Sequence, residues 1–256
     1  MDEEIRGYYE TGIEAERLGQ GYSRVELERT KEILGRYLPS QPMHVLDVGG
    51  GPGVYAEWLA EQGHVVRLVD AMPLHVEQAL ERAQGRFTAM LGDARELEEA
   101  DGSYDVVLLF GPLYHLLERE ERLTALREAR RVLRRGGLVA VAAISRFASL
   151  LDGLFNRYLG DPKFWPIVER DLDDGQHRSA SGYFTTAFFH HPDELADEVE
   201  SAGFTLDGLY GVEGPGWLLI ERDDSYDDIL RVAAAVEREP SVIGTSSHLL
   251  AIGRKD

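Results

Sequence analysis

The residues whose types and spacing most clearly indicate ligand binding lie in the glycine-rich stretch VLDVGGGPG, at 45–53. Its apolar part suits a buried parallel strand, and the alternate glycines Gly49, Gly51 and Gly53 let the backbone turn sharply and approach a ligand closely. A helix that begins near Val54 would direct free backbone N–H groups and the positive end of its dipole at that ligand. The stretch therefore predicts a loop that binds the polar part of a small molecule.

The spacing of the glycines distinguishes two classes of cofactor. A dinucleotide fingerprint needs the order G-x-G-x-x-G. Counted from Gly49, the third glycine falls at Gly53, and Val54 occupies the place where a pyrophosphate loop needs a small residue. The order in this chain is D-x-G-x-G-x-G, beginning at Asp47, and it disfavours a pyrophosphate ligand. A role as a simple turn remains open at this point.

Asp70 is the second residue with evident chemistry. It ends the apolar run 64–70, and a carboxylate offers two oxygens in one plane to the two hydroxyls of a ribose. Ala71 and Met72 follow it and are expected along the adenine side of such a ligand. Because NAD enzymes use an acidic residue in the same way, Asp70 indicates a ribose-bearing cofactor without choosing which one. Its alternative role is to cap a loop.

Four motifs, taken in order, resemble those of the class I S-adenosylmethionine-dependent methyltransferases: 45–53, 68–70, 92–94 and 113–116. In that family the glycine loop holds the methionine end of the cofactor. An Asp after the third strand commonly accepts from the adenine amino group, and the next backbone N–H donates to a ring nitrogen. Asp93 and Ala94 occupy these places.

The resemblance implies S-adenosylmethionine as the cofactor. The N-terminal region often folds over the cofactor in this family, so Tyr9 and Arg29 are expected as contacts from that region. The full set of residues expected to bind the cofactor is Tyr9, Arg29, Asp47, Gly49, Gly50, Gly51, Asp70, Ala71, Met72, Gly92, Asp93, Ala94 and Phe110.

Candidate groups for proton transfer lie at two places. Tyr114 and His115 follow the apolar run 104–110, and ligands of open α/β sheets bind beyond the carboxyl ends of the strands. The segment GPLYHL also resembles the segment after strand four in a group of small-molecule methyltransferases. His190 and His191 precede a predicted helix and are expected near the pocket mouth. The predicted catalytic residues are His115, Tyr114 and His190, and no metal is expected, because adjacent histidines cannot easily share one ion.

The elements that position these residues alternate between apolar runs and helical stripes. They predict an α/β, Rossmann-like, doubly wound sheet of seven strands, mostly parallel, and the family resemblance implies an antiparallel last strand. The predicted strands are 45–48, 64–70, 86–91, 104–110, 138–144, 204–212 and 248–252. The main predicted helices are 3–10, 13–18, 23–37, 54–61, 73–82, 118–135, 192–202 and 226–238.

Length and composition limit the organisation and the partners. We expect one domain over 1–256, with a helical cap at 1–40 and an aromatic-rich insertion at 145–191 that covers the substrate. The net charge is −19, from 46 acidic and 27 basic residues, and argues against a nucleic-acid partner. There are no cysteines, no apolar run long enough to cross a membrane and no secretory signal, so we expect a cytoplasmic protein without a membrane partner.

The expected function is methyl transfer from S-adenosylmethionine to a small-molecule acceptor by in-line attack, with release of S-adenosylhomocysteine. The attacking atom, N, O or S, stays open, as does the choice between a monomer and a homodimer. Two alternatives are an NAD(P)-dependent oxidoreductase and a non-catalytic module that binds S-adenosylmethionine.

Overall fold

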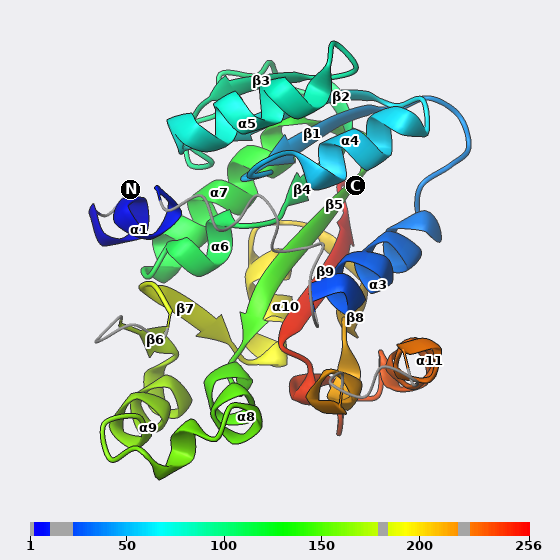
Figure 1. The fold of residues 1–256 in the computed structure, drawn as a ribbon. Helices are drawn as coiled ribbons and strands as arrows, with labels where there is room; N and C mark the ends of the chain where they lie inside the picture. The colour runs from blue at the N-terminus through cyan, green and yellow to red at the C-terminus, as the bar shows by residue number, and fades with distance from the viewer. Residues whose placement is uncertain (1–2, 11–22, 179–183, 220–225) are drawn as a thin grey trace.

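The computed structural model describes residues 3–10, 23–178, 184–219 and 226–256, and a β-sheet runs through its centre (Figure 1). The strands of the main sheet are β1 (His44–Val48), β2 (Val65–Asp70), β3 (Thr88–Leu91), β4 (Tyr104–Leu109), β5 (Leu133–Ser145), β8 (Thr205–Gly211) and β9 (His248–Arg254). Their order is β3-β2-β1-β4-β5, and β9 then pairs with both β5 and β8. The first five strands are parallel, whereas β9 is antiparallel to both of its neighbours. The predicted, mostly parallel sheet with an antiparallel last strand is confirmed, and two short strands of the insertion extend it from the predicted seven strands to nine.

Helices cover both faces of this sheet. The described residues form the helices α1 (Glu3–Tyr9), α3 (Ser23–Gly35), α4 (Val54–Glu61), α5 (Pro73–Ala83), α6 (Pro112–His115), α7 (Arg119–Val132), α8 (Ala148–Phe155), α9 (Trp165–Asp174), α10 (Pro192–Ser201) and α11 (Tyr226–Val236), with 3-10 turns η1 (Tyr158–Gly160), η2 (Gly214–Leu219) and η3 (Ile243–Thr245). Apolar side chains of α3, α4 and α5 form one core layer with the sheet, and those of α7 and α10 form the other. The strands are thus buried on both sides, which explains why they read as continuous apolar runs.

Burial of the central strands fixes the positions of their ends. Leu46 of β1, Leu68 of β2 and Leu108 of β4 are fully buried. Each such side chain contributes about 1.5–3 kcal/mol through removal from water. Because these strands are parallel, the loops that follow them meet at one edge of the sheet, where the motifs at 49–53, 70–72 and 110–115 lie together.

The insertion at 145–191 contributes two short strands to the sheet. After α8 and α9 it forms a short hairpin of β6 (Gln176–His177) and β7 (Ala187–His190). β7 is parallel to the end of β5, pairing Phe189 with Ile144 and His190 with Ser145. The sequence did not predict this strand, because a short apolar run has no periodicity that separates strand from helix.

The predicted end of the helix before β5 was wrong. α7 ends at Val132 rather than at 135, and the double glycine, Gly136 and Gly137, lies inside β5 at an irregularity in its pairing with β4. The N–H of Gly136 donates to the carbonyl of Lys255, and a Cβ on Gly137 would lie 2.8 Å from the carbonyl oxygen of Arg134. The glycines therefore allow close approach of backbone at a strand start, rather than stopping a helix there.

Two further predictions concern a helix near the N-terminus and membrane-spanning segments. The predicted helix at 13–18 lies outside the described residues. Among the helices that the structure describes, none combines the length and the apolar character needed to span a bilayer.

Candidate functional site

A cavity of about 160 Å³ opens at the carboxyl edge of the sheet, and we call it the first cavity. Loops after β1, β2, β3 and β4 form its walls, and α1, α3 and β9 contribute the rest. Most of the residues predicted to bind the cofactor line it: Tyr9, Gly49, Gly50, Gly51, Asp70, Ala71, Met72, Gly92, Asp93, Ala94 and Phe110. Tyr114 and His115 also line it. Segments separated widely in the sequence thus form one continuous surface.

The glycine loop has the backbone conformation that the spacing predicts. Gly49 and Gly51 have φ values of 73° and 55°, in the left-handed region that favours glycine. A Cβ on Gly49 would lie 2.5 Å from Cδ of Pro112, so this position also requires a small residue. A Cβ on Gly51 would meet no described atom within 4 Å, which leaves the backbone of Gly51 open to a ligand.

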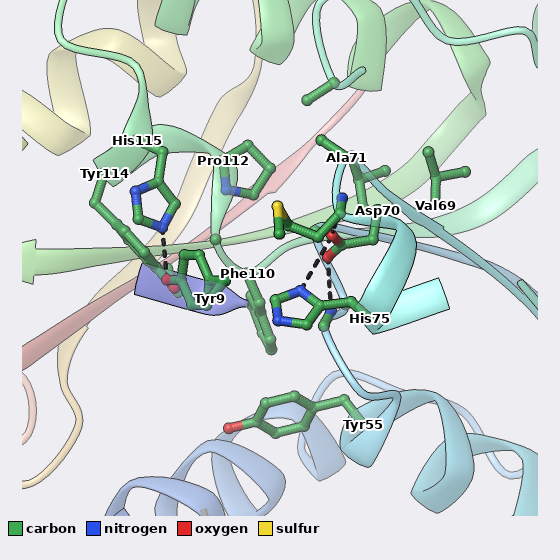
Figure 2. A pocket seen from close by; sticks show the side chains of 18 of the residues that line it. Tyr9, Tyr55, Val69, Asp70, Ala71, His75, Phe110, Pro112, Tyr114 and His115 are labelled. Atoms are coloured by element: carbon green, nitrogen blue, oxygen red, sulfur yellow. Dashed lines mark hydrogen bonds and ion pairs between the residues drawn. The ribbon is translucent and has the colours of Figure 1, made fainter. Parts of the chain in front are cut away.

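Asp70 connects this loop to the turn after β2 (Figure 2). One carboxylate oxygen accepts from the N–H of Gly51 at 2.9 Å, and the other accepts from the N–H of Met72 at 2.8 Å. The second oxygen also lies 3.2 Å from Nδ1 of His75. The loop-capping role that the sequence left open is therefore present. Since each carboxylate oxygen can accept more than one hydrogen bond, Asp70 retains capacity for ligand hydroxyls.

Tyr9 and His115 form a pair on the opposite side of the first cavity (Figure 2). The Tyr9 hydroxyl lies 2.7 Å from Nε2 of His115, and their rings meet edge to face. Burial lowers the pKa of His115 to about 4, although a backbone hydrogen bond with Thr186 acts in the opposite direction. His115 is therefore neutral at neutral pH, and it is a weaker base than proton abstraction favours.

Asp93 lies at the rim of the first cavity and interacts with Arg95. Its carboxylate accepts from the Arg95 backbone N–H at 2.9 Å and from the guanidinium at 3.0 and 2.6 Å. The side-chain hydrogen bond with Arg95 is the main reason why the pKa of Asp93 is lowered. Asp93 is thus an ionised hydrogen-bond acceptor, as the predicted contact with an adenine amino group requires.

Asp47 lies behind the glycine loop and does not line the first cavity. It is fully buried, and neither carboxylate oxygen has a hydrogen-bond partner among the described residues. A Cβ on Gly50 would lie 2.5 Å from its Oδ2, so Asp47 fills the space under the loop. Burial, with a smaller effect from the charge of Asp70, raises the pKa of Asp47 to about 7. Asp47 is therefore a supporting residue rather than a ligand contact.

Asp47 should make folding depend on pH. Its folded pKa exceeds the ordinary 3.8, so the folded state binds this proton more tightly than the unfolded chain does. The stability is then fully present below the unfolded pKa and is lost as pH rises from about 4 through about 7. We expect Asp47→Asn to exceed wild type at about pH 8 by about 1 to 4 kcal/mol, because each pKa unit corresponds to about 1.4 kcal/mol.

Urea unfolding of both proteins without added cofactor, over this pH range, measures that difference. The gap should shrink as the pH falls toward about 4, where Asp47 is protonated in both states. Asp197→Asn, at an exposed carboxylate, is the matched control. A gap between Asp47→Asn and wild type that does not change with pH would contradict the expectation.

Two more predicted site residues, in addition to Asp47, do not line the first cavity. Arg29 is fully buried and forms ion pairs with Glu32 and Glu237. His190 is fully buried, and its Nε2 lies 3.3 Å from Glu198. Neither side chain lines the first cavity, so the expectations that Arg29 contacts the cofactor and that His190 acts in catalysis are corrected. Both groups instead stabilise contacts between helices and neighbouring elements.

A second cavity, of about 250 Å³, adjoins the first. The insertion supplies much of its wall, with aromatic rings from Phe164, Phe184 and Phe189 and polar groups from Ser149, Asp152 and His177. Burial raises the pKa of Asp152, opposed by a hydrogen bond from Asn156. The cavity thus combines aromatic walls with several polar groups.

Three of the described residues, Tyr9, Tyr114 and His248, line both cavities and mark their junction. Sequence reasoning identified Tyr9 and Tyr114 but placed His248 only as the start of a strand. It also missed His75, whose position five residues after Asp70 at the start of a helix is the signal that could have found it. His248 has no local signal, because the residues around it come from distant segments.

Known proteins of similar sequence and structure agree with this fold. A family model described as a methyltransferase domain matches residues 45–137. The ubiquinone biosynthesis O-methyltransferase of Cereibacter sphaeroides is 31% identical over 201 residues, covering 73% of this chain and 71% of that protein. The methyltransferase GfsG of Streptomyces halstedii is 31% identical over 186 residues, covering 69% of this chain and 58% of that protein.

A solved structure shares the fold. The crystal structure of a SAM-dependent methyltransferase from Methanosarcina mazei aligns with a TM-score of 0.62 at 20% identity, covering 87% of this chain and 96% of that one. The chain belongs to the class I S-adenosylmethionine-dependent methyltransferase family. It is a methyltransferase enzyme, and S-adenosylmethionine is its cofactor. The alternatives of a nicotinamide-dependent oxidoreductase and of a non-catalytic module are not retained.

The residues of the first cavity fit this cofactor. The open backbone at Gly51 provides a cradle that a side chain would fill, and Asp70 has remaining acceptor capacity for ribose hydroxyls. Nε2 of His75 is buried without a hydrogen-bond partner in the described part of the chain, so it can bond to a polar atom of a ligand. Met72 and Phe110 supply apolar surface for the adenine ring of the cofactor.

Proposed function

We propose that this enzyme transfers the methyl group of S-adenosylmethionine to a planar small molecule held in the second cavity. The observation that carries the proposal is the contact of the two cavities at Tyr9, Tyr114 and His248. Methyl transfer needs the cofactor and the acceptor to meet at one point, and this junction provides it. The names of relatives, which include a ubiquinone biosynthesis O-methyltransferase, agree with a small aromatic acceptor.

The lining of the second cavity supports a planar acceptor that carries polar groups. The ring of Tyr8 packs edge to face on Tyr9 and on Phe184, with ring centres 5.2 and 5.7 Å away. Phe189 stacks on His177, with ring centres 5.1 Å apart. Aromatic walls favour offset-stacked or edge-to-face contacts with a flat ligand. The net charge of −19 does not favour a polyanionic acceptor, because like charges repel.

Most of the catalytic effect in this proposal comes from positioning. The bound cofactor supplies an electrophilic methyl group on a cationic sulfur. Residues of the chain then have to hold an acceptor atom in line with that methyl group and exclude water. Such orientation can contribute roughly 7 to 11 kcal/mol toward lowering the barrier. Tyr9 and Tyr114 are positioned to orient the acceptor, since both line the junction.

The direct test measures S-adenosylhomocysteine release. Purified protein and S-adenosylmethionine are incubated with flat aromatic phenols, amines and thiols, and mass spectrometry identifies the methylated product. We expect turnover with at least one of these classes. Cofactor binding by calorimetry without turnover on any flat aromatic probe would contradict the proposed acceptor class.

Filling the second cavity should separate acceptor binding from cofactor binding. Ala148 lines only the second cavity and is buried at the start of α8. We expect Ala148→Phe to raise KM for a flat aromatic acceptor by about tenfold or more, since overpacking a site costs about 1–3 kcal/mol. Calorimetry should give a cofactor Kd close to that of wild type. Unchanged KM in a folded variant would show that the acceptor binds elsewhere.

A further inference from the structure

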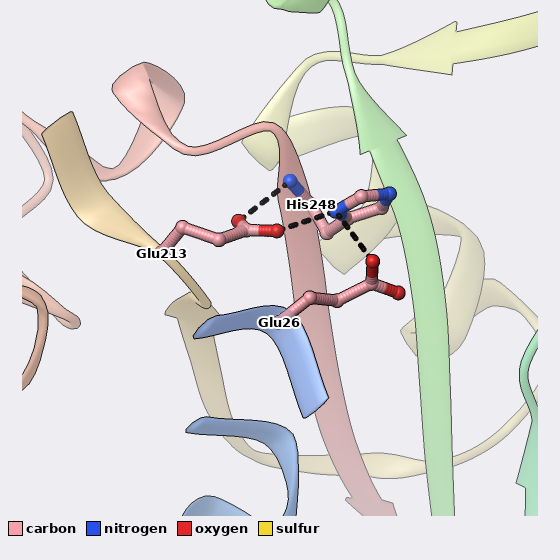
Figure 3. A group of neighbouring side chains, drawn as sticks. All are labelled: Glu26, Glu213 and His248. Atoms are coloured by element: carbon pink, nitrogen blue, oxygen red, sulfur yellow. Dashed lines mark hydrogen bonds and ion pairs between the residues drawn. The ribbon is translucent and has the colours of Figure 1, made fainter. Parts of the chain in front are cut away.

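His248 has the surroundings of a catalytic base, with two carboxylates behind it (Figure 3). Its Nδ1 lies 2.5 Å from Oε1 of Glu213, and its backbone N–H donates to Oε2 of the same carboxylate at 3.0 Å. Oε2 of Glu26 lies 3.7 Å from the same ring nitrogen. Two carboxylates so close to one imidazole can stabilise the imidazolium that forms when the histidine takes a proton.

The geometry of this group is built into the sheet. His248 begins β9, and Glu213 follows β8, two strands that pair with each other. The hydroxyl of Ser246 accepts from the N–H of Glu213 at 2.9 Å and from the N–H of Gly214 at 2.7 Å. The side chain of Glu213 is fully buried. A histidine held by a buried carboxylate on adjacent strands keeps one tautomer and one orientation, as pre-organised proton transfer requires.

The other histidines of the two cavities are less suited to take a proton from an acceptor. His115 is bonded to Tyr9, and burial lowers its pKa to about 4. His75 is beside Asp70 and lines only the first cavity. His177 is paired with Asp171 but lines only the second cavity. Of the histidines in the described residues, only His248 lines both cavities, so it alone lies at the junction where the proposed function places methyl transfer.

We propose that His248 is the general base of this methyltransferase, that Glu213 is its positioning residue, and that the acceptor is a hydroxyl-bearing aromatic molecule. The inference rests on the proposed function and adds the attacking atom to it. A base is needed only where the acceptor arrives with a proton that must leave, as a phenol does. An amine or a thiolate can attack directly, so a built base at the junction would be unnecessary for them.

The proton and electrons balance within this step. Nε2 of His248, on the far side of the ring from Glu213 (Figure 3), takes the proton as the hydroxyl O–H bond breaks. An electron pair of that oxygen forms the new bond to the methyl carbon, and the pair of the broken carbon–sulfur bond stays on sulfur. Glu213 stabilises the resulting imidazolium, which then returns the proton to water.

The same three side chains could in principle hold a metal ion, because one donor atom from each lies within 4.8 Å of the others. The observed contacts favour the proton-transfer role. Nδ1 of His248 contacts Oε1 of Glu213 directly, and both oxygens of Glu213 are engaged by His248, which leaves no space for an ion between them. A metal ion at this nitrogen would have to displace the proton between the two groups.

The test compares two flat probes that differ in one atom, a naphthol and the corresponding naphthalenethiol. The naphthol is protonated at neutral pH, whereas the thiol ionises readily and needs no base. We expect His248→Asn to lower kcat/KM for the naphthol by about 10²- to 10⁴-fold. For the thiol it should change kcat/KM by no more than about threefold.

Glu213→Gln is the second variant and keeps the shape of the site. Its amide group would hold His248 in the other tautomer, with a proton already on Nε2, so the loss should again be confined to the naphthol. His44→Asn, at an exposed histidine at the start of β1, is the matched control and should leave both rates unchanged. Cofactor Kd from calorimetry confirms that each variant is folded.

Each result has one meaning. If His248→Asn loses activity equally on both probes, or on neither, His248 is not the general base. Wild-type turnover of the thiol alone would also overturn that role. If a chelator abolishes naphthol turnover and added magnesium ions restore it, the three side chains bind a metal ion instead of acting in proton transfer. Wild type that binds the cofactor but methylates neither probe would overturn the proposed function itself.

Discussion

Replacement of Asp70 by alanine is expected to weaken S-adenosylmethionine binding by about 10- to 100-fold, since hydrogen bonds to a charged group contribute about 1.5–3 kcal/mol. Two effects combine in this variant. The ribose hydroxyls lose a charged acceptor, and the N–H groups of Gly51 and Met72 lose the carboxylate that now joins them. The second effect loosens the glycine loop at the point where the cofactor should lie against it.

Calorimetric titration with S-adenosylmethionine and with S-adenosylhomocysteine measures this loss. Asp70→Asn keeps one oxygen acceptor and should fall between alanine and wild type. Asp197→Ala removes an exposed carboxylate with an arginine partner and serves as the control. If Asp70→Ala binds the cofactor as wild type does, Asp70 does not contact it and the assignment of the first cavity fails.

Replacement of Arg122 by leucine should lower the free energy of unfolding more than any other substitution proposed for this protein. Arg122 is buried on α7, and its guanidinium donates to Glu198 of α10 at 2.7–3.1 Å. It also donates to the carbonyls of Leu116 and Leu117 at 2.9 and 2.7 Å. Burial alone would raise the pKa of Glu198, but hydrogen bonds from His190 and Arg122 keep it below the ordinary value. Glu198 is therefore a buried charge that depends on its partners.

Removing one partner of a buried ion pair costs about 3–5 kcal/mol, because the remaining charge stays away from water. We expect Arg122→Leu to lose that much free energy of unfolding in urea. Arg119→Leu is a matched control on the same helix, since its exposed pair with Asp197 contributes about 1 kcal/mol or less. The double variant Arg122→Leu with Glu198→Leu should recover much of the loss.

A loss in Arg122→Leu no larger than that in Arg119→Leu would contradict this account. The arginine also links stability to the site, because Leu116 directly follows His115. Its guanidinium carbon lies 3.6 Å from the ring centre of Phe188 in β7, so it holds the inserted hairpin against α7 as well. Partial recovery of stability in the double variant need not restore activity, because the two carbonyls still lack their donor.

The sequence predicted the sheet and the residues of the first cavity because both depend on local patterns. Apolar runs define the strands, and the residues directly after a strand lie at its carboxyl end. Parallel strands bring those ends to one edge. Motifs at 49–51, 70–72 and 92–94 could therefore be placed together from their order alone, and the structure brings them to one cavity.

The failures at Arg29 and His190 have a common cause. Both residue types suit a ligand contact, and both lie in regions that pass near the cavities. Their partners decide otherwise: Glu237 is 208 positions from Arg29, and a buried carboxylate on α10 pairs with His190. No local pattern reports whether a charged or polar side chain already has a partner inside the fold.

By itself, the sequence determined the family, the cofactor and the positions of the seven main strands along the chain, because each follows from short motifs or from apolar runs. Only the tertiary structure shows the second cavity and the carboxylates around His248, on which the proposals for the acceptor and the base rest. His248, Glu213 and Glu26 come from β9, the segment after β8 and α3, and none stands in a motif. Their few ångströms of separation result from strand pairing and helix packing, which are non-local interactions that no stretch of sequence records.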